Sequence, residues 1–258
     1  MGSRLVEMGY PALDLPPITT RLEAGVVAGR YPAHGYARGW GLEFGTLADQ
    51  IAAHPLYNEA LEVARGRSVM REHRLMNLFL IITCYLNLLP HQNIAEFGSY
   101  RGGSALFMAH LLRRLYPRAR LFAFDTFEGM PKVNDAADLH EAGDFSDSDL
   151  SGLLQARLGS SLPQLHIVQG LVQETFAASK ARALQFGLAH FDMDIYEPTV
   201  FAQEQMWPLM CKGGYYVYDD ATVSSCIGAM QAVEDLIRLR GLHSEQAYPH
   251  FVFRVGLN

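Results

Sequence analysis

Short apolar runs alternate with amphipathic segments from about residue 93 to the end of the chain. The apolar runs are typical of strands and fall at 94–97, 121–125, 165–170, 188–194 and 213–220. Helical spacing of apolar residues predicts helices between them, at 102–116, 199–210 and 225–240. Strands that are apolar along their whole length and alternate with helices favour a parallel sheet covered by helices on both faces.

The end of the chain adds a different pattern. Short stretches at 244–248 and 251–255 flank Pro249, a residue that favours a turn. We expect them to form an antiparallel hairpin at one side of the sheet. The predicted fold is therefore α/β, with a mostly parallel sheet of seven strands.

Residues 1–90 do not follow the alternating pattern. Helical spacing extends over 47–65 and 70–89, and Pro90 ends the second helix. Residues 1–45 are rich in glycine, proline and aromatic residues without a sustained period, which predicts an irregular arm. We therefore expect an N-terminal arm and helical cap over 1–90 and a core over 91–258, integrated into one domain.

Composition places the chain among ordinary globular proteins and excludes several kinds of partner. Nearly half of the 258 residues are apolar, and the net charge of −6 is unsuited to binding nucleic acid, which requires clustered Lys and Arg. The most apolar window, 78–89, is too short to span a membrane and predicts a core helix. The N-terminus lacks the pattern of a signal peptide, and we expect a cytoplasmic protein without a membrane partner.

The cysteines and histidines show no local metal-binding motif. Cys84, Cys211 and Cys226 stand in apolar surroundings, without the spacing of a disulfide framework or a zinc site. No two histidines have the H-x-x-x-H or H-E-x-x-H spacing, and His190 is predicted to be a core residue of a strand. A reducing compartment fits this use of cysteine.

Two predicted strands end in pairs of carboxylates. Asp192 and Asp194 close the stretch LAHFDMD, and Asp219 and Asp220 close GGYYVYDD. One helix separates these strands, so both ends should meet at the carboxyl edge of the sheet, where open α/β folds bind ligands. Like charges beside a buried strand repel one another unless a cation neutralises them, and oxygen ligands favour Mg²⁺. We therefore predict a magnesium site, with Asp194 beside it as the general base.

A glycine-rich turn, EFGSYRGGS, follows the first core strand. Gly98, Gly102 and Gly103 allow a sharp turn into a helix, whose first amides can bind an anion. Glu96 can accept a hydrogen bond from an amine, and Asp125 at the end of the next strand can accept from ribose hydroxyls. An amine, a carboxylate and a ribose describe S-adenosylmethionine better than NAD, whose G-x-G-x-x-G spacing is absent.

The segment 132–150 concentrates carboxylates with almost no counter-charge. Its acidic residues are Asp135, Asp138, Glu141, Asp144, Asp147 and Asp149. This composition favours a mobile, solvated loop. Because the segment follows Asp125 at the functional edge, it could also close over substrate as a lid.

Taken together, five ordered stretches make the chain resemble the macrocin O-methyltransferase family, which methylates sugar hydroxyls of macrolides, aminocoumarins and related natural products. The stretches are EFGSYRGG, FDTFEGMPK, DMDIYEPT, KGGYYVYDD and QAVEDL, between about residues 94 and 237. The resemblance implies a class I methyltransferase (Rossmann-like) fold and a Mg²⁺-dependent transferase acting on a glycosylated small molecule in antibiotic biosynthesis. It also suggests a homo-oligomer.

The resemblance implies which residues bind each group. S-adenosylmethionine would contact Met70, Glu96, Gly98, Ser99, Tyr100, Arg101, Ser104, Asp125, Thr126, Phe127, Gln169 and Gly170. The metal ligands would be Asp192, Asp219 and Asp220, and Asp194 falls at the position of the base. The chain departs from the family pattern in two places, where His190 replaces an arginine and Leu171 replaces an aromatic residue.

The expected mechanism is metal-assisted methyl transfer. A cation that chelates two neighbouring sugar oxygens would lower the pKa of the reacting hydroxyl, and Asp194 would remove its proton. Two alternatives stay open at this point. One is a non-catalytic protein that binds a nucleoside-type ligand, in which the acidic cluster is structural, and the other is an NAD-dependent oxidoreductase.

Overall fold

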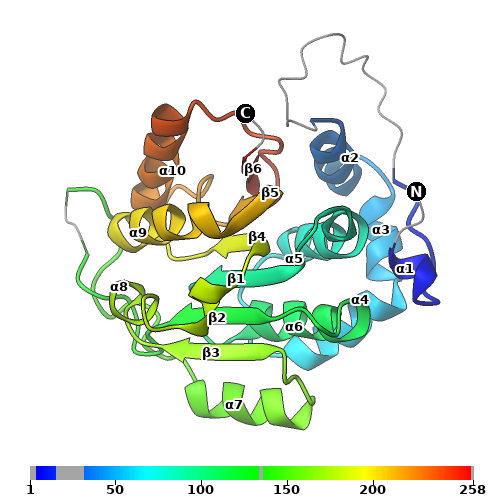
Figure 1. Ribbon diagram of the computed structural model, residues 1–258, viewed down its shortest axis with the longest axis horizontal. Coiled ribbons are helices and arrows are strands. Elements are labelled where there is room, and N and C mark those ends of the chain that lie inside the picture. Colours follow the sequence, from blue (N-terminus) through cyan, green and yellow to red (C-terminus); the bar gives the residue numbers. More distant parts are fainter. Residues whose placement is uncertain (1–3, 16–31, 134–135, 257–258) are drawn as a thin grey trace.

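A sheet of six strands organises the computed structural model, which describes residues 4–15, 32–133 and 136–256 (Figure 1). The strands are β1 (Asn93–Phe97), β2 (Leu121–Asp125), β3 (Leu165–Gln169), β4 (Phe186–Phe191), β5 (Met210–Tyr218) and β6 (Phe251–Arg254). Their order is β3-β2-β1-β4-β5-β6, and β6 is antiparallel to β5 whereas the other neighbours are parallel. The winding reverses between β1 and β4, and ligands of open α/β sheets bind beyond the carboxyl ends of such strands.

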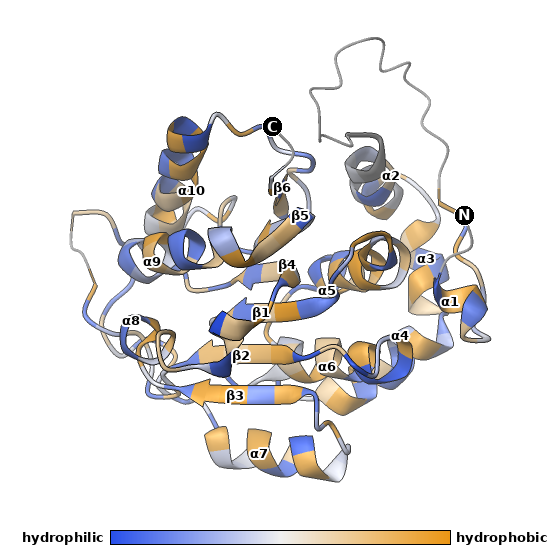
Figure 2. Ribbon diagram, viewed as in Figure 1, coloured by the Kyte–Doolittle hydropathy of each residue, from blue (hydrophilic) through white to orange (hydrophobic). Residues whose placement is uncertain are grey.

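Alternate residues of the strands face two separate hydrophobic layers. Ile94 and Leu188 belong to the layer that contains Tyr57 and Phe107 from the N-terminal half of the chain. Phe97 and its neighbours on β2 and β4 belong to the opposite layer. Strands buried on both faces need apolar residues on both, which is why orange predominates on β2 and β3 in Figure 2; Glu96 of β1 and His190 of β4 are buried polar exceptions. The predicted α/β sheet is therefore confirmed.

Helices cover both faces of this sheet (Figure 1). Those of the core are α6 (Gly103–Leu115), α7 (Leu150–Gly159), α8 (Val172–Thr175), α9 (Tyr196–Met206) and α10 (Ile227–Arg240), with 3₁₀ turns at Lys180–Ala183 and Trp207–Leu209. Those that precede β1 are α1 (Arg4–Glu7), α2 (Pro32–Glu43), α3 (Leu47–Ala52), α4 (Pro55–Ala64) and α5 (Glu72–Leu80). Helix α5 continues into a π-helical turn (Ile81–Tyr85) and a 3₁₀ turn (Leu86–Leu88). No helix of the described ranges is long and apolar enough to cross a membrane.

The predicted count of seven strands is wrong by one. The stretch expected at 244–248 is reduced to an isolated bridge between Gln246 and Val252. The side chain of Gln246 bonds to the turn and to helix α5, because its Nε2 donates to the carbonyl of Tyr248 at 2.6 Å and to Oδ1 of Asn77 at 2.9 Å. The segment is thus tied to a helix beside the single bridge to β6.

The predicted irregular arm over 1–45 is also partly wrong, because α2 occupies its end; residues 16–31 lie outside the described ranges. Two glycines that suggested a loop lie on α2, where the helix packs closely against the backbone of Glu245 and Tyr248. A Cβ on Gly35 would lie 2.2 Å from the carbonyl oxygen of Glu245, and one on Gly39 would lie 2.7 Å from that of Tyr248. The helix predicted over 47–65 is divided at His54, whose extended backbone precedes a proline.

Candidate functional site

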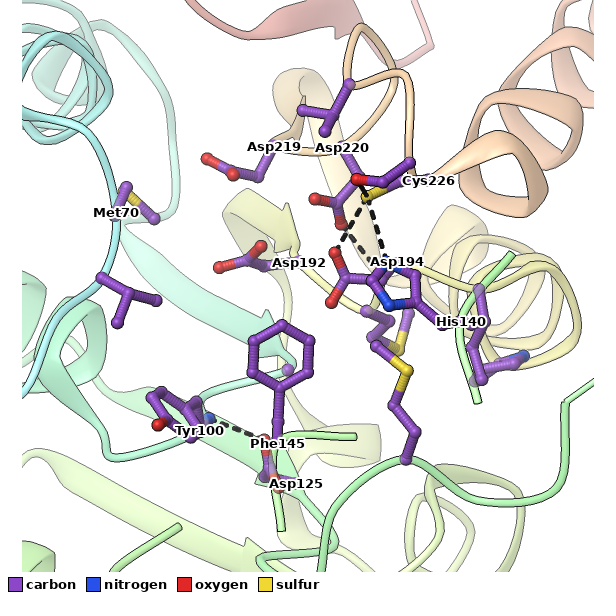
Figure 3. A pocket seen from close by; sticks show the side chains of 18 of the residues that line it. Met70, Tyr100, Asp125, His140, Phe145, Asp192, Asp194, Asp219, Asp220 and Cys226 are labelled. Atoms are coloured by element: carbon purple, nitrogen blue, oxygen red, sulfur yellow. Dashed lines mark hydrogen bonds between the residues drawn. The ribbon is translucent and has the colours of Figure 1, made fainter. Parts of the chain in front are cut away.

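A cavity of about 990 Å³ opens at the carboxyl ends of the central strands (Figure 3). Its walls come from the loop after β1, the ends of β2, β4 and β5, the start of α5 and the segment before α7. The cavity lies at the edge where the sheet order reverses. Its position agrees with the edge that the sequence pattern predicted.

The glycine-rich turn approaches β4 so closely that a side chain is excluded. Gly98 has a φ of +83°, and a Cβ there would lie 1.8 Å from the carbonyl oxygen of Asp192. The turn then bends around Asp125, whose Oδ2 accepts from the amides of Ser99 at 2.6 Å and Tyr100 at 2.8 Å. A glycine at this position therefore brings the β1 turn, β2 and the acidic end of β4 into one wall.

Asp125 is the carboxylate that organises the wall formed by the glycine-rich turn. Its Oδ1 accepts from the amide of Phe127 at 2.6 Å, in addition to the two amides bound by Oδ2. Burial raises the pKa of Asp125, although these three amides oppose the shift. The two amides occupy both lone pairs of Oδ2, but Oδ1 keeps one, so Asp125 can hold the turn and still accept from one ligand hydroxyl.

Glu96 lies beneath this wall. It is fully buried, and its Oε2 accepts from the hydroxyl of Ser99 at 2.8 Å while Oε1 lies 3.2 Å from Nδ1 of His190. His190 is a buried strand residue, as predicted, and its Nε2 has no hydrogen-bond partner among the described residues. Glu96 thus supports the turn from below, and a ligand amine would reach it only through a rearrangement of Ser99.

The predicted cofactor residues fall into two groups. Those that line the cavity are Met70, Gly98, Tyr100, Asp125, Thr126 and Gly170. Those that lie behind or beside its surface are Glu96, Ser99, Arg101, Ser104, Phe127 and Gln169. The guanidinium of Arg101 pairs with Asp147, outside this wall.

Three carboxylates converge on the other side of the cavity, and of these Asp219 and Asp220 are buried and Asp192 is half-buried. Asp192, Asp219 and Asp220 each offer an oxygen, and these atoms lie within 4.8 Å of one another. Burial, and then the neighbouring carboxylates, raise the pKa values of Asp192 and Asp220 well above the usual range. Three hard oxygen donors fit a divalent cation such as Mg²⁺, which would offset the repulsion between Asp192 and Asp220.

Asp219 differs from its neighbours because basic groups surround it. Burial acts to raise its pKa, but a hydrogen bond with His250 and the charge of Arg74 outweigh burial and lower it. Nε2 of His250 lies 3.0 Å from Oδ1 of Asp219, and Arg74 forms an ion pair with Oδ2. Sequence reasoning missed His250, because no local motif connects a residue after a proline turn with the end of β5.

Asp194 lies beside the three carboxylates (Figure 3). Its backbone amide donates to Oδ2 of Asp220 at 3.0 Å, and its φ of +62° is unusual for a residue other than glycine. Its own Oδ1 accepts from the thiol of Cys226 at 3.1 Å. The structure therefore places the predicted base next to the predicted metal ligands, and its side chain faces the cavity.

The acidic segment before α7 receives more counter-charge than its sequence suggested. Arg101 pairs with Asp147, and Arg67 lies 3.1 Å from Asp149. Asp138 is buried, and its Oδ1 accepts from the amide of Tyr196 at the start of α9 at 2.8 Å. The expected lack of counter-charge is therefore wrong for Asp147 and Asp149, whose side chains stay exposed, and the expected solvation is wrong for Asp138; Asp135 lies outside the described residues.

Residues 64–246 match the family model described as Macrocin-O-methyltransferase (TylF). A curated relative from Streptomyces olivaceus, 8-demethyl-8-(2,3-dimethoxy-alpha-L-rhamnosyl)-tetracenomycin-C 4'-O-methyltransferase, is 29% identical over 54% of this chain and 56% of its own length. Mycinamicin III 3''-O-methyltransferase from Micromonospora griseorubida is 24% identical over 55% of this chain and 60% of its own length. The chain thus spans somewhat more than half of each curated relative.

Among solved structures, the O-methyltransferase NovP is similar in fold. It superimposes with a TM-score of 0.64 at 20% sequence identity, over 76% of this chain and 87% of NovP. This likeness shows that the chain has the class I methyltransferase fold.

Proposed function

Because the chain belongs to the macrocin-O-methyltransferase family, we propose that it transfers the methyl group of S-adenosylmethionine to a sugar hydroxyl of a glycosylated natural product, with the help of a divalent cation. The observation that carries this proposal is one cavity with two chemically different walls. One wall is the glycine turn with Asp125, and the other is the cluster of Asp192, Asp219 and Asp220.

The first wall suits the cofactor. Asp125 has one acceptor site, on Oδ1, for a ribose hydroxyl beyond the three amides that it already binds. Gly98 and Gly170 expose backbone to the cavity without side chains in the way, and Tyr100 and Met70 supply apolar surface for the remainder of the ligand. The glycine spacing does not match a dinucleotide fingerprint, which favours S-adenosylmethionine over NAD.

The second wall suits an acceptor hydroxyl. Asp192, Asp219 and Asp220 would hold the cation, which when bound would lower the pKa of a coordinated hydroxyl. Asp194 would then take the proton at a carboxylate oxygen. The amide bond to Asp220 fixes the backbone of Asp194, and the thiol of Cys226 fixes one of its oxygens. Such positioning of the reacting groups is expected to lower the activation barrier of methyl transfer more than the proton transfer alone does.

The curated relatives support this acceptor class, because their names specify methyl transfer to the 4' oxygen of a rhamnosyl-tetracenomycin and to the 3'' oxygen of mycinamicin III. We extend this class, and not their individual compounds, to the present chain. Phe145 and Tyr248 add aromatic surface to the cavity, and such surface packs well against the apolar faces of sugar rings.

Calorimetric titration of the purified chain with S-adenosylhomocysteine, with and without EDTA and with NAD as a control, tests the cofactor assignment. We expect binding of S-adenosylhomocysteine alone, followed by Mg²⁺-dependent methylation when glycosylated natural products are screened. Absence of S-adenosylhomocysteine binding would overturn the methyltransferase proposal. Binding of the same ligand with methyl transfer unaffected by EDTA would overturn the role of the cation only.

A further inference from the structure

A second group of metal-ligand side chains lies in the same cavity, next to the three-carboxylate cluster. Nε2 of His140, a carboxylate oxygen of Asp194 and Sγ of Cys226 lie within 4.8 Å of one another. All three residues line the cavity (Figure 3). They come from the acidic segment, the turn after β4 and the loop before α10, so the fold alone brings them together.

We propose that His140, Asp194 and Cys226 form a separate binding site for a borderline divalent cation of the Zn²⁺ type. A thiolate and an imidazole favour such cations, whereas the all-oxygen cluster of Asp192, Asp219 and Asp220 favours Mg²⁺. The two sites are therefore distinguished by the chemistry of their donors. The cavity leaves the fourth position of the new site open to water or to a ligand oxygen, as in catalytic zinc sites.

The distances between the donors suit a tetrahedral ion. Sγ of Cys226 lies 3.1 Å from Oδ1 of Asp194 and 3.7 Å from Nε2 of His140. Zinc–sulfur and zinc–nitrogen bonds of about 2.3 and 2.0–2.1 Å at a tetrahedral angle place their donor atoms roughly 3.5 Å apart. The two separations from Sγ lie on either side of this value, and all three donors lie within 4.8 Å of one another.

The hydrogen bond behind His140 supports the same inference. Nδ1 of His140 lies 3.1 Å from Oδ2 of Asp144, and a carboxylate there can only accept. Nδ1 therefore carries the hydrogen, and Nε2 turns its lone pair toward Cys226. Carboxylate, imidazole and metal in this order is the usual arrangement around metal-bound histidine.

Cation binding would exchange one proton for one metal ion. Without a metal, the thiol hydrogen of Cys226 lies between Sγ and Asp194. A divalent cation would replace that hydrogen, form bonds to Sγ, Nε2 and the carboxylate oxygen, and release one proton to solvent. This exchange requires no oxidant or reductant.

One consequence rests on the proposed function. A cation held here engages the same Asp194 carboxylate that would act as the base, so Zn²⁺ is expected to inhibit Mg²⁺-dependent methyl transfer. The binding itself does not depend on methyl transfer. Failure of the proposed function would therefore leave the metal-binding test intact.

The test is titration of the EDTA-stripped full chain with Co²⁺, which is a spectroscopic substitute for zinc. We expect one equivalent to produce thiolate-to-cobalt absorption in the near ultraviolet, and Zn²⁺ to displace it. The absorption should vanish in Cys226→Ser and persist in Cys84→Ser, a matched change at a partly exposed cysteine, and in Asp192→Asn, which alters only the oxygen cluster. Its absence from the wild-type chain, or its persistence in Cys226→Ser, would overturn the proposal.

Two further variants keep the test decisive if Cys226→Ser does not fold. His140→Gln, on the surface segment, should weaken Co²⁺ binding strongly, whereas Asp144→Asn should weaken it by about 10–100-fold without abolishing the thiolate absorption. Unchanged Co²⁺ affinity in both variants would contradict the assignment of His140 as a ligand.

Discussion

At the scale of single residues, Asp194 combines an unusual backbone with a defined side-chain environment. Its φ of +62° lies in the left-handed region, which asparagine and aspartate tolerate better than other residues with a side chain. Its amide is bound by Asp220 and its carboxylate by Cys226. Replacement by asparagine therefore keeps the backbone and the acceptor oxygen and removes only the basic carboxylate.

We expect Asp194→Asn to reduce turnover by about 10²–10⁴-fold, the usual contribution of a general base. Calorimetric affinity for S-adenosylhomocysteine should stay nearly unchanged, because Asp194 lies beside the carboxylate cluster and not on the wall formed by the glycine turn and Asp125. Asp49→Asn, at an exposed position of α3, serves as the control and should retain full activity. Full turnover by Asp194→Asn would remove Asp194 from the role of base.

Burial of His250 is expected to make the free energy of unfolding depend on pH. Burial lowers its pKa to about 4, against the hydrogen bond to Asp219, whereas the pKa of an unfolded histidine is about 6.5. Between these pH values the unfolded chain binds the extra proton, so the free energy of unfolding should fall as the pH decreases. The contribution of one such group is at most about 1.4 kcal/mol per pH unit.

Urea unfolding at several pH values between 4 and 7, in EDTA, measures this slope. His250→Gln should reduce the slope of the unfolding free energy against pH by up to about 1.4 kcal/mol per pH unit, the value for one proton. This holds whatever the effect of the substitution on stability at neutral pH. His243→Gln, at an exposed position, should leave the slope as in the wild type. Equal slopes for wild type and His250→Gln would show that His250 is not buried in its neutral form.

At the scale of elements, the turn between β1 and α6 connects the two walls of the site. Gly98 supplies both the positive φ and the contact with the carbonyl of Asp192. Gly66 offers a comparison, because its φ is +71° and a Cβ there would meet nothing within 4 Å. The two glycines share the backbone conformation and differ in their surroundings.

Gly66→Ala should therefore cost only the strain of the left-handed backbone, about 1–2 kcal/mol of the free energy of unfolding. Gly98→Ala adds a backbone clash and should cost several kcal/mol or prevent folding. Urea denaturation of both variants measures the difference. Equal costs would mean that the turn can move away from β4 without penalty.

At the scale of the whole molecule, a buried ion pair ties the N-terminal cap to the end of the chain. NH2 of Arg38 lies 2.6 Å from Oε1 of Glu245, and both side chains are fully buried. The guanidinium also stacks over the rings of Tyr85 and Tyr215, at 4.8 and 5.4 Å. Helix α2 is thereby fixed beside the segment that carries Tyr248 to the cavity and His250 to Asp219.

Arg38→Ala should lower the free energy of unfolding by about 3–5 kcal/mol, because it leaves the carboxylate of Glu245 buried with fewer partners. Arg65→Ala breaks the exposed pair with Glu62 and should cost less than about 1 kcal/mol. Thermal and urea unfolding of the two variants test this contrast. A small effect of Arg38→Ala would indicate that α2 is not needed to hold the C-terminal segment.

The sequence alone determined the parallel core and the wall residues that end its strands. Apolar runs and the acids that follow them are local features, and parallel strands necessarily bring their carboxyl ends to one edge. For this reason Asp125, Asp192, Asp194, Asp219 and Asp220 could be assigned to one edge before any coordinates.

Tertiary structure decided what no local pattern encodes. His250 reaches Asp219, and Arg38 reaches Glu245, across long stretches of the chain. His140 and Cys226 meet at Asp194 although neither has a metal-binding spacing in the sequence. Such contacts depend on how separate elements pack, and periodicity reports only the face that each element buries. The strand ends were therefore predictable, whereas the groups that surround them were not.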